Sequence, residues 1–307
     1  MPTIRAAFIG DIVGKPGRQA LARDLPKLRR ELRADTVIVN CENARHGRGP
    51  NPATYNELLN TPAGGPDALT MGDHALDDPT IKTTLANPDT IISRPWNMPG
   101  FTAEHRPYTI ARISKRSPLA ATALPPIAVV TILGRAFMAV EPDPKHHHPF
   151  EAADDAINTI ARKLPDALFI IEVHAEATSE KAAMAHHCAI NHQRRVVAVV
   201  GTHTHCQTND PRLIPLHDPE GDPDPTELLA SLANQTHGIA AISDLGCTAP
   251  EFSVIGFNPR QSIERLKNQR GQIHPATAEA TTRGALITID TEARAATSIQ
   301  TINLPPD

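Results

Sequence analysis

Aromatic side chains and an excess of positive charge are what this sequence has least of. Aromatic residues make up 3% of the 307 positions, and 30 lysines and arginines face 34 aspartates and glutamates, for a formal net charge of −4. A base-stacking platform needs aromatic side chains, and non-specific nucleic-acid binding needs a basic surface. We therefore expect no stable nucleic-acid partner.

Cysteine and long apolar runs are also scarce. The four cysteines are widely spaced and form no Cys-x-x-Cys pair, which is typical of reduced thiols in a cytoplasmic protein. No apolar stretch approaches the ~18 residues that a membrane span requires. The N-terminal segment lacks the apolar region and cleavage site of a secretion signal. We expect a cytoplasmic protein that does not associate with membranes.

The remaining composition is that of a globular protein. Hydrophobic residues make up 40% and charged residues 21%, and 29 prolines argue against an architecture of long helices. No composition break marks a boundary, so we expect one domain over residues 1–307, with small cap elements within 95–150. An acidic, proline-rich stretch predicts a loop insertion at about 216–237.

Short β-branched runs bounded by turn residues recur along the chain and predict strands. The predicted strands cover residues 4–9, 36–39, 68–71, 91–92, 108–113, 127–133, 137–140, 168–173, 196–200, 239–242, 253–257, 286–289 and 299–302. Amphipathic patterns predict helices at 18–32, 150–164 and 179–188, with Ser179 as an N-cap and a kink at Pro26. The expected fold is α/β: a sandwich of mixed β-sheets flanked by helices.

Polar clusters stand directly at the ends of five of these predicted strands. The clusters are Gly10-Asp11, Asn40-Cys41-Glu42-Asn43, Gly72-Asp73-His74, Glu172-Val173-His174 and Gly201-Thr202-His203-Thr204-His205. Ligands bind at the carboxyl ends of strands in open α/β sheets. Aspartate, glutamate, asparagine and histidine at five such ends predict a metal site with many ligands.

The chemistry of these side chains favours two metal ions. Imidazole and carboxylate together suit iron, manganese and zinc. Asp11, Glu42 and Asp73 would repel one another without cations. A metal pair binds a phosphate ester and generates a hydroxide for in-line attack. On an extended segment, His203 and His205 would point to the same side of the backbone and serve one cluster.

The same strings resemble a known family. Their order is similar to that of the calcineurin-like metallophosphoesterases, whose motifs run Gly-Asp, an acidic bridging residue, Gly-Asn-His, His and Gly-x-His-x-His. The YmdB-like subfamily is the more specific match, through FIGDIVGKPGR, VNCENARHGRG, HAEATSEK, VVGTHTHCQT and ISDLGCTAP. The resemblance extends from about Phe8 to about Phe257 and implies the calcineurin-like sandwich of two mixed sheets.

The resemblance also implies a role for each site residue. The implied metal ligands are Asp11, Glu42, Asn43, Asp73, His174, His203 and His205. Glu42 would bridge the two metals. The first metal would take Asp11, Asn43 and His205, and the second would take Asp73, His174 and His203. His74 would lie beside the scissile ester and donate a proton to the leaving oxygen.

The sequence departs from the family string at Asp73, where the family has asparagine. The added negative charge should tighten cation binding, weaken the attraction for a phosphate and raise the pKa of His74. The segment 216–237 also looks longer than the family's equivalent connection.

Three functions follow as hypotheses. The first is a dinuclear metal-dependent phosphodiesterase, with iron or manganese and with zinc as an alternative, acting on 2′,3′-cyclic nucleotides or related phosphodiesters. The second is a regulatory metal- or nucleotide-binding protein with weak or lost turnover, which Asp73 motivates. The third is a mononuclear metal hydrolase acting on an amide. The resemblance also suggests a homo-oligomer.

Several other histidines lack a strand-end context. His146, His147 and His148 are expected to form a solvated loop, and His186 and His187 are expected to be surface or packing residues of a helix.

Overall fold

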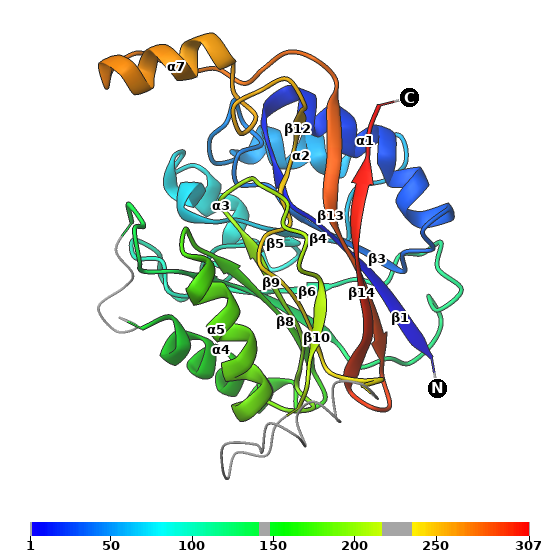
Figure 1. Cartoon of the computed structure of the whole chain (residues 1–307). Helices are drawn as coiled ribbons and strands as arrows, with labels where there is room; N and C mark the ends of the chain where they lie inside the picture. The colour runs from blue at the N-terminus through cyan, green and yellow to red at the C-terminus, as the bar shows by residue number, and fades with distance from the viewer. Residues whose placement is uncertain (1, 141–147, 217–234, 307) are drawn as a thin grey trace.

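Two β-sheets pack face to face in the computed structural model, and helices cover the outer face of each (Figure 1). The structure describes residues 2–140, 148–216 and 235–306. The α/β sandwich predicted from the sequence is confirmed. His146, His147 and most of the expected insertion at 216–237 lie outside the described residues.

The first sheet has eight strands and combines both ends of the chain. Its order is β2-β12-β13-β1-β3-β4-β5, and β14 pairs with the free side of β13. The bounds are β1 (Thr3–Ile9), β2 (Asp11–Ile12), β3 (Thr36–Asn40), β4 (Ala68–Thr70), β5 (Ile92–Ser93), β12 (Cys247–Pro250), β13 (Ala280–Asp290) and β14 (Ala295–Leu304). Strands β1, β3, β4 and β5 run parallel, so their carboxyl ends share one edge.

The second sheet has six strands in the order β10-β11-β9-β8-β7-β6. The bounds are β6 (Thr109–Ala111), β7 (Ile127–Leu133), β8 (Leu168–His174), β9 (Val196–Thr202), β10 (Arg212–Ile214) and β11 (Ile239–Ile242). The four central strands are parallel, and the edge strands β6 and β10 are antiparallel to their neighbours. Parallel strands covered on both faces read as unbroken apolar runs, as β7 and β9 do.

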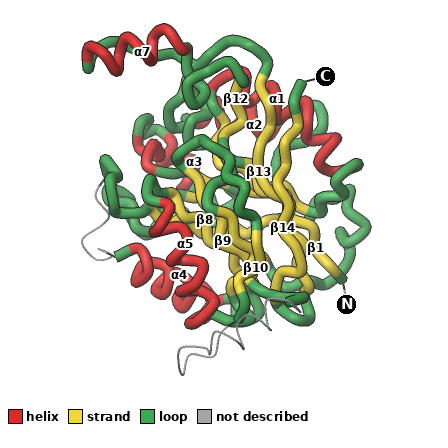
Figure 2. The backbone as a smooth tube through the Cα atoms, viewed as in Figure 1, coloured by secondary structure: helices red, strands yellow, loops and turns green. Residues whose placement is uncertain are grey.

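Helices cover each sheet on the side away from its partner (Figures 1 and 2). On the first sheet lie α1 (Gly14–Arg30), α2 (Pro52–Leu59), the 3-10 turn η1 (Asp73–Leu76) and α3 (Ile81–Leu85). On the second lie α4 (Pro149–Lys163) and α5 (Thr178–Asn191), while α7 (Pro259–Asn268) stands out from the body of the fold. Among the described residues, no helix is both long enough and apolar enough to cross a bilayer.

The central core lies between the two sheets. Phe8 and Ile287 from the first sheet pack in the same cluster as Val129, Ile170 and Val200 from the second, and all five are fully buried. Two further apolar clusters fill the space between each sheet and its helices. This continuous packing holds the strand ends of both sheets in fixed positions relative to one another.

Two predicted strands are wrong. Residues 137–140 form a turn, because the amides of Arg135 and Ala136 donate to the Glu180 carboxylate and Phe137 adopts a φ of 63°. Residues 253–257 form a tight turn closed by a Val254–Phe257 bridge. Both runs are apolar, but within the part of the chain that the structure describes neither joins a sheet, and beyond its own turn Phe257 makes only an isolated bridge to Pro275.

The predicted helix ends were only partly right. Helix α5 begins at Thr178 with Ala177 as its N-cap, so Ser179 is not the cap. Helix α1 continues past Pro26 to Arg30. Helices α2 and α7 were not predicted, although each begins with an asparagine cap, Asn51 or Asn258, followed by the start signal of a proline.

Candidate metal centre

The five polar clusters gather where the carboxyl ends of β1, β3 and β4 meet those of β8 and β9. Glycines allow this approach. A Cβ on Gly72 would lie 1.9 Å from Glu42 Oε2 and 2.3 Å from His174 Nε2, so no other residue fits there without moving the cluster. The Gly-Asp-His string therefore places Asp73 beside the ends of two other strands.

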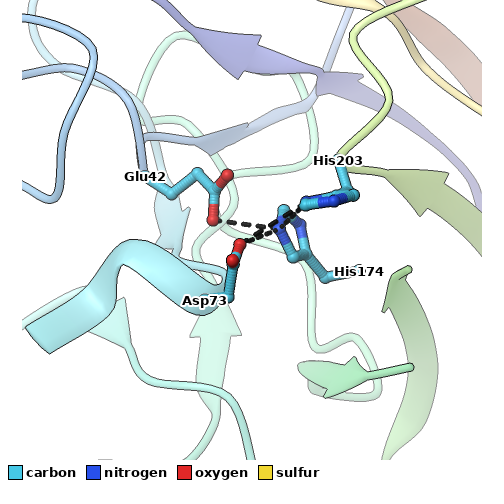
Figure 3. Close-up of side chains that lie close together, drawn as sticks. All are labelled: Glu42, Asp73, His174 and His203. Atoms are coloured by element: carbon cyan, nitrogen blue, oxygen red, sulfur yellow. Dashed lines mark hydrogen bonds and ion pairs between the residues drawn. The ribbon is translucent and has the colours of Figure 1, made fainter. Parts of the chain in front are cut away.

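One group of four potential ligands comes from both sheets (Figure 3). Nε2 of His174 lies 3.0 Å from Glu42 Oε2 and 2.9 Å from Asp73 Oδ1. Nδ1 of His203 lies 3.1 Å from His174 Nε2 and 3.5 Å from Asp73 Oδ1. Two imidazoles and two carboxylates thus point at one spot.

A second group shares Glu42 with the first. Asp11, Glu42 and His205 each offer a ligand atom, and these atoms lie within 4.8 Å of one another. Nε2 of His205 is also 2.9 Å from Asn43 Oδ1. All seven sequence-predicted metal ligands therefore lie in two adjoining groups, and Glu42 stands between them.

Buried carboxylate oxygens crowd these two groups. Asp11 Oδ1 is buried and has no hydrogen-bond partner, and buried Glu42 Oε2 contacts His174 Nε2 at 3.0 Å. Burial and the neighbouring Glu42 charge raise the pKa of Asp11 well above its usual value. Burial also opposes the charge on Glu42, but the attraction and hydrogen bond of His174 lower the pKa of Glu42 below its usual value. Unpartnered buried carboxylate oxygens are costly, and cations would compensate them.

Each histidine has its outward ring nitrogen bonded to an acceptor. His205 Nδ1 donates to the Ile255 carbonyl at 2.8 Å, and His203 Nε2 faces Glu176 Oε2 at 3.3 Å. His174 Nδ1 contacts Thr202 Oγ1 at 2.9 Å. These partners hold one ring nitrogen of each histidine outward and leave the other ring nitrogen facing into the groups of potential ligands. Histidines that bind metals are oriented in this way, so the residues fit a pair of metal ions.

A buried network from both sheets orients His174. Thr202 Oγ1 donates its proton to Glu172 Oε1 at 2.9 Å. The hydroxyl is therefore the acceptor in its contact with His174, and His174 Nδ1–H is the donor. Glu172 also accepts from Asn40 Nδ2 at 2.5 Å and from Thr131 Oγ1 at 2.8 Å. Glu172 was visible at a strand end in the sequence, but no role was predicted for it. Its position is that of a support for His174.

The His203–His205 segment is not extended, which corrects the prediction that both imidazoles serve one cluster. His203 has a φ of 93° and His205 a φ of 64°, so the chain turns sharply at both. Thr204 donates its amide and hydroxyl to Asp244 Oδ2, which also accepts from buried Lys181. The turn sends His203 to the Asp73 group and His205 to the Asp11 group.

His74 stands beside the two groups of potential ligands and belongs to neither. Its Nδ1 is 2.9 Å from Asp77 Oδ2, one turn along the chain. This hydrogen bond raises the pKa of His74 to about 9, with further contributions from Glu42 and Asp73. Hydrogen bonds from His174 and His203 outweigh burial and lower the pKa of Asp73, so Asp73 stays ionised. Asp77 was missed because its role depends on the fold of η1.

A pocket of about 720 Å³ opens at His74. Its lining residues are mostly basic or aromatic, and they are His46, Gly47, Arg48, His74, Asp77, Phe257, Arg265, Gln272, Ile273 and His274. Gly47 has a φ of 77°, and a Cβ there would lie 2.4 Å from the Phe257 ring, which fixes this wall. Basic groups around such a hollow favour an anionic ligand.

Cys41, Cys206 and Trp96 lie outside the groups of potential ligands. Cys41 is buried and its Sγ lies 3.2 Å from the Thr70 carbonyl, and Cys206 is exposed. Neither belongs to the ligand groups found among the described residues. Trp96 packs against the core of the second sheet and donates Nε1 to Asp155.

Known proteins resemble this chain over nearly its whole length. A Bacillus subtilis (strain 168) protein named 2′,3′-cyclic-nucleotide 2′-phosphodiesterase is 32% identical over 305 residues, which cover 99% of this chain and 98% of that protein. The crystal structure of a novel phosphatase from Mycoplasma pneumoniae matches with a TM-score of 0.76 and 27% identity, covering 100% of this chain and 95% of that one.

A second solved structure, a hypothetical protein from Thermus thermophilus, matches with a TM-score of 0.72 and 28% identity, over 98% of this chain and 100% of that one. The sequence model of the YmdB-like protein family matches residues 7–302. On this match, and on the full-length relatives beside it, the chain belongs to the YmdB-like protein family.

Proposed function

We propose that this chain is a dinuclear metal-dependent phosphodiesterase that hydrolyses 2′,3′-cyclic nucleotides or related phosphodiesters. That it is a phosphoesterase follows from its relatives. The finer assignment rests on one observation: the buried carboxylate of Glu42 stands in both groups of potential ligands. A carboxylate in this position can bridge two metals.

The residues that would hold the metals divide as the two groups do. Asp11, Asn43 and His205 would hold one ion, Asp73, His174 and His203 the other, with Glu42 between them. We propose iron or manganese, with zinc as the alternative, because imidazole and carboxylate ligands suit all of these. When bound, the ions would supply positive charge for the phosphate and lower the pKa of a water nucleophile.

The protein's own residues would then position the ester and supply a proton. Arg48, Arg265 and the pocket histidines would attract the phosphate, and Asp77 would keep His74 protonated. His74 would donate that proton to the departing ribose oxygen. The substrate class comes from the name of the Bacillus relative and agrees with the basic lining of the pocket.

Metal analysis and a hydrolysis assay test this proposal together. Protein purified without a histidine tag or chelator should hold about two metal ions per chain, and Glu42→Ala should lose them. Hydrolysis of bis(p-nitrophenyl) phosphate should fall at least about 100-fold in His203→Ala. His237→Ala is the matched control, because that histidine also contacts a carboxylate, Asp290, but lies at the amino end of β11. Equal rates for wild type and His203→Ala would refute the proposal.

A second candidate function is metal or nucleotide binding with weak turnover, and Asp73 favours it. This carboxylate is ionised and adds negative charge where a phosphate would approach. Under the binding function, Asp73→Asn should raise turnover strongly while reducing metal affinity. If the chain is an efficient enzyme, the kcat of Asp73→Asn should be close to that of wild type. Comparing kcat for the two proteins at saturating metal separates the functions.

A further inference from the structure

A separate set of metal-type side chains lies between α4 and the end of α5, away from the strand ends. Asp154 comes from α4, His187 from α5, and His192 directly follows α5. Asp154 Oδ1 is 2.7 Å from His187 Nε2 and 2.5 Å from His192 Nε2. The two helices lie side by side on the outer face of the second sheet (Figure 1). Two imidazole rings thus meet at one oxygen of Asp154.

The backbone fixes His192 at the junction of α5 and β9. Its amide donates to the Cys188 carbonyl, and its own carbonyl accepts from Arg195 and Val196. The side chain of His192 is 8% exposed, that of His187 is 22% exposed, and that of Asp154 is 38% exposed. The cluster is therefore anchored on one side and open to solvent on the other.

The His187 ring is also held in place. It packs against Phe150 of α4, with the ring centroids 5.1 Å apart. Its Nδ1 lies 3.2 Å from Asn191 Nδ2. With Nε2 engaged by a cation, the proton moves to Nδ1, and rotation of the Asn191 amide gives that N–H an oxygen acceptor.

We propose that Asp154, His187 and His192 form a zinc-binding site, with water completing the coordination. A single histidine suffices for an ion pair with aspartate, whereas here two imidazoles present the same ring nitrogen to one carboxylate oxygen. Two imidazoles, one carboxylate and an open side are the ligand set of a three-residue zinc site. The three ligand atoms lie within 4.8 Å of one another. Zinc bonds of about 2.0–2.1 Å need ligand atoms ~3.3 Å apart, which small side-chain rotations provide.

The site would tie α4 to the start of β9. Helix α4 packs on the second sheet through its buried face, which includes Ala156, Ile157 and Ile160, and a cross-link at its solvent-facing side would add a separate contact to α5 and the start of β9. A bound zinc ion should therefore raise the melting temperature of the protein. It does so by mass action, because the unfolded chain does not hold the three ligands together.

Zinc counting between matched variants tests the site. After equilibration with zinc and gel filtration, wild type should hold one more ion per chain than the His187→Ala/His192→Ala double variant. His237→Ala is the control for loss of a histidine beside a carboxylate, and it should keep the wild-type count. Asp154→Asn is nearly isosteric and should weaken binding of the same ion at least about tenfold, even if the double variant folds poorly.

Two further measurements test whether the ion is bound by these three residues and not elsewhere in the chain. A His146→Ala/His147→Ala variant, changed outside the described residues, should keep the ion. Cobalt added in place of zinc should give visible absorption bands of a four-coordinate site in wild type, and at limiting cobalt these bands should be weaker in Asp154→Asn. Equal zinc counts in wild type and the double variant, or loss of the ion in the His146/His147 variant, would overturn the proposal. Because these variants all keep Glu42 and its neighbours, the difference is independent of whether the proposed dinuclear centre holds metal.

Discussion

His74 and Asp77 are joined by a hydrogen bond of 2.9 Å between Nδ1 and Oδ2. The two residues are in the same helical turn, so the contact depends on η1 alone. It is the largest of the effects that hold the pKa of His74 at about 9. If His74 donates a proton, the bond keeps it in the donating form across the neutral range.

The first prediction concerns pH. A proton donor must be protonated, so activity should fall as pH rises through the pKa of His74. Asp77→Asn removes the carboxylate whose hydrogen bond and charge raise this pKa, and it should shift the alkaline limb of the kcat profile to lower pH. Asp78→Asn is the matched control, because Asp78 lies 3.6 Å from Arg45 rather than beside His74. An alkaline limb that stays in place in Asp77→Asn would rule out His74 as the donor.

The second prediction concerns Gly72. The alanine Cβ would collide with Glu42 and His174, so Gly72→Ala should displace both ligands. We expect loss of metal and a fall of about 100-fold in kcat/KM, the scale of a misplacement near 1 Å. Gly64→Ala is the control: Gly64 has a φ of 79°, and a Cβ there would meet only Arg29 Nη1 at an ordinary contact distance of 3.7 Å, so alanine should cost ~1 kcal/mol of stability and leave metal content unchanged. Full metal occupancy in Gly72→Ala would contradict the packing argument.

The third prediction separates support of His174 from general stability. Thr202→Val removes a hydroxyl that contacts both Glu172 and His174, and should reduce metal affinity about 10- to 100-fold. Thr131→Val removes a hydroxyl that contacts Glu172. Each should lower the free energy of unfolding by about 1–3 kcal/mol in a denaturant titration. If both variants lose metal affinity equally, the Thr202 contact to His174 is not the cause.

The fourth prediction concerns the stability of the metal-free protein. Neutralising Asp11 and neutralising Glu42 should change the free energy of unfolding in opposite directions. Burial raises the pKa of Asp11 in the folded state, so its ionisation destabilises the fold as pH rises above the unfolded value near 3.8. Asp11→Asn should therefore stabilise chelated protein at pH 7. Glu42 has a lowered pKa and is paired with His174, so Glu42→Gln should destabilise it by about 3–5 kcal/mol. The measurement is chemical unfolding after chelation and dialysis, and destabilisation by Asp11→Asn would refute this account.

Much of the sandwich could be predicted from the sequence, because strands buried on both faces are continuous apolar runs. Strand β7 begins and ends at the predicted residues 127 and 133. Short segments such as β2 and β12 escaped prediction, because they are strands only through pairing with each other and with β13. The turn at Phe137 reads as a strand locally, and only the Glu180 carboxylate explains its conformation.

The candidate site also has a part that could be predicted from the sequence and a part that could not. The residues that gather at the strand ends were visible because each follows a clear strand. Their supports were not, since the contact of Asn40 with Glu172 joins two sheets across 132 residues of sequence. The backbone turns at His203 and His205 also gave no local signal, because neither is a glycine. The roles of the site residues could thus be assigned in advance only through the family resemblance. The orientation of their side chains could be read only from the folded structure.

Strand β1 lies between β3, which follows it closely, and β13, which begins at Ala280. During synthesis on the ribosome, the β1 edge that will meet β13 stays without its partner until the residues from Ala280 to Asp290 have emerged. Asp11 lies two residues after the end of β1, so the candidate metal centre borders a strand whose pairing waits for β13. A chain truncated before Ala280 would thus keep an unpaired edge on β1, next to the candidate metal centre. An unpaired strand edge of this kind promotes aggregation.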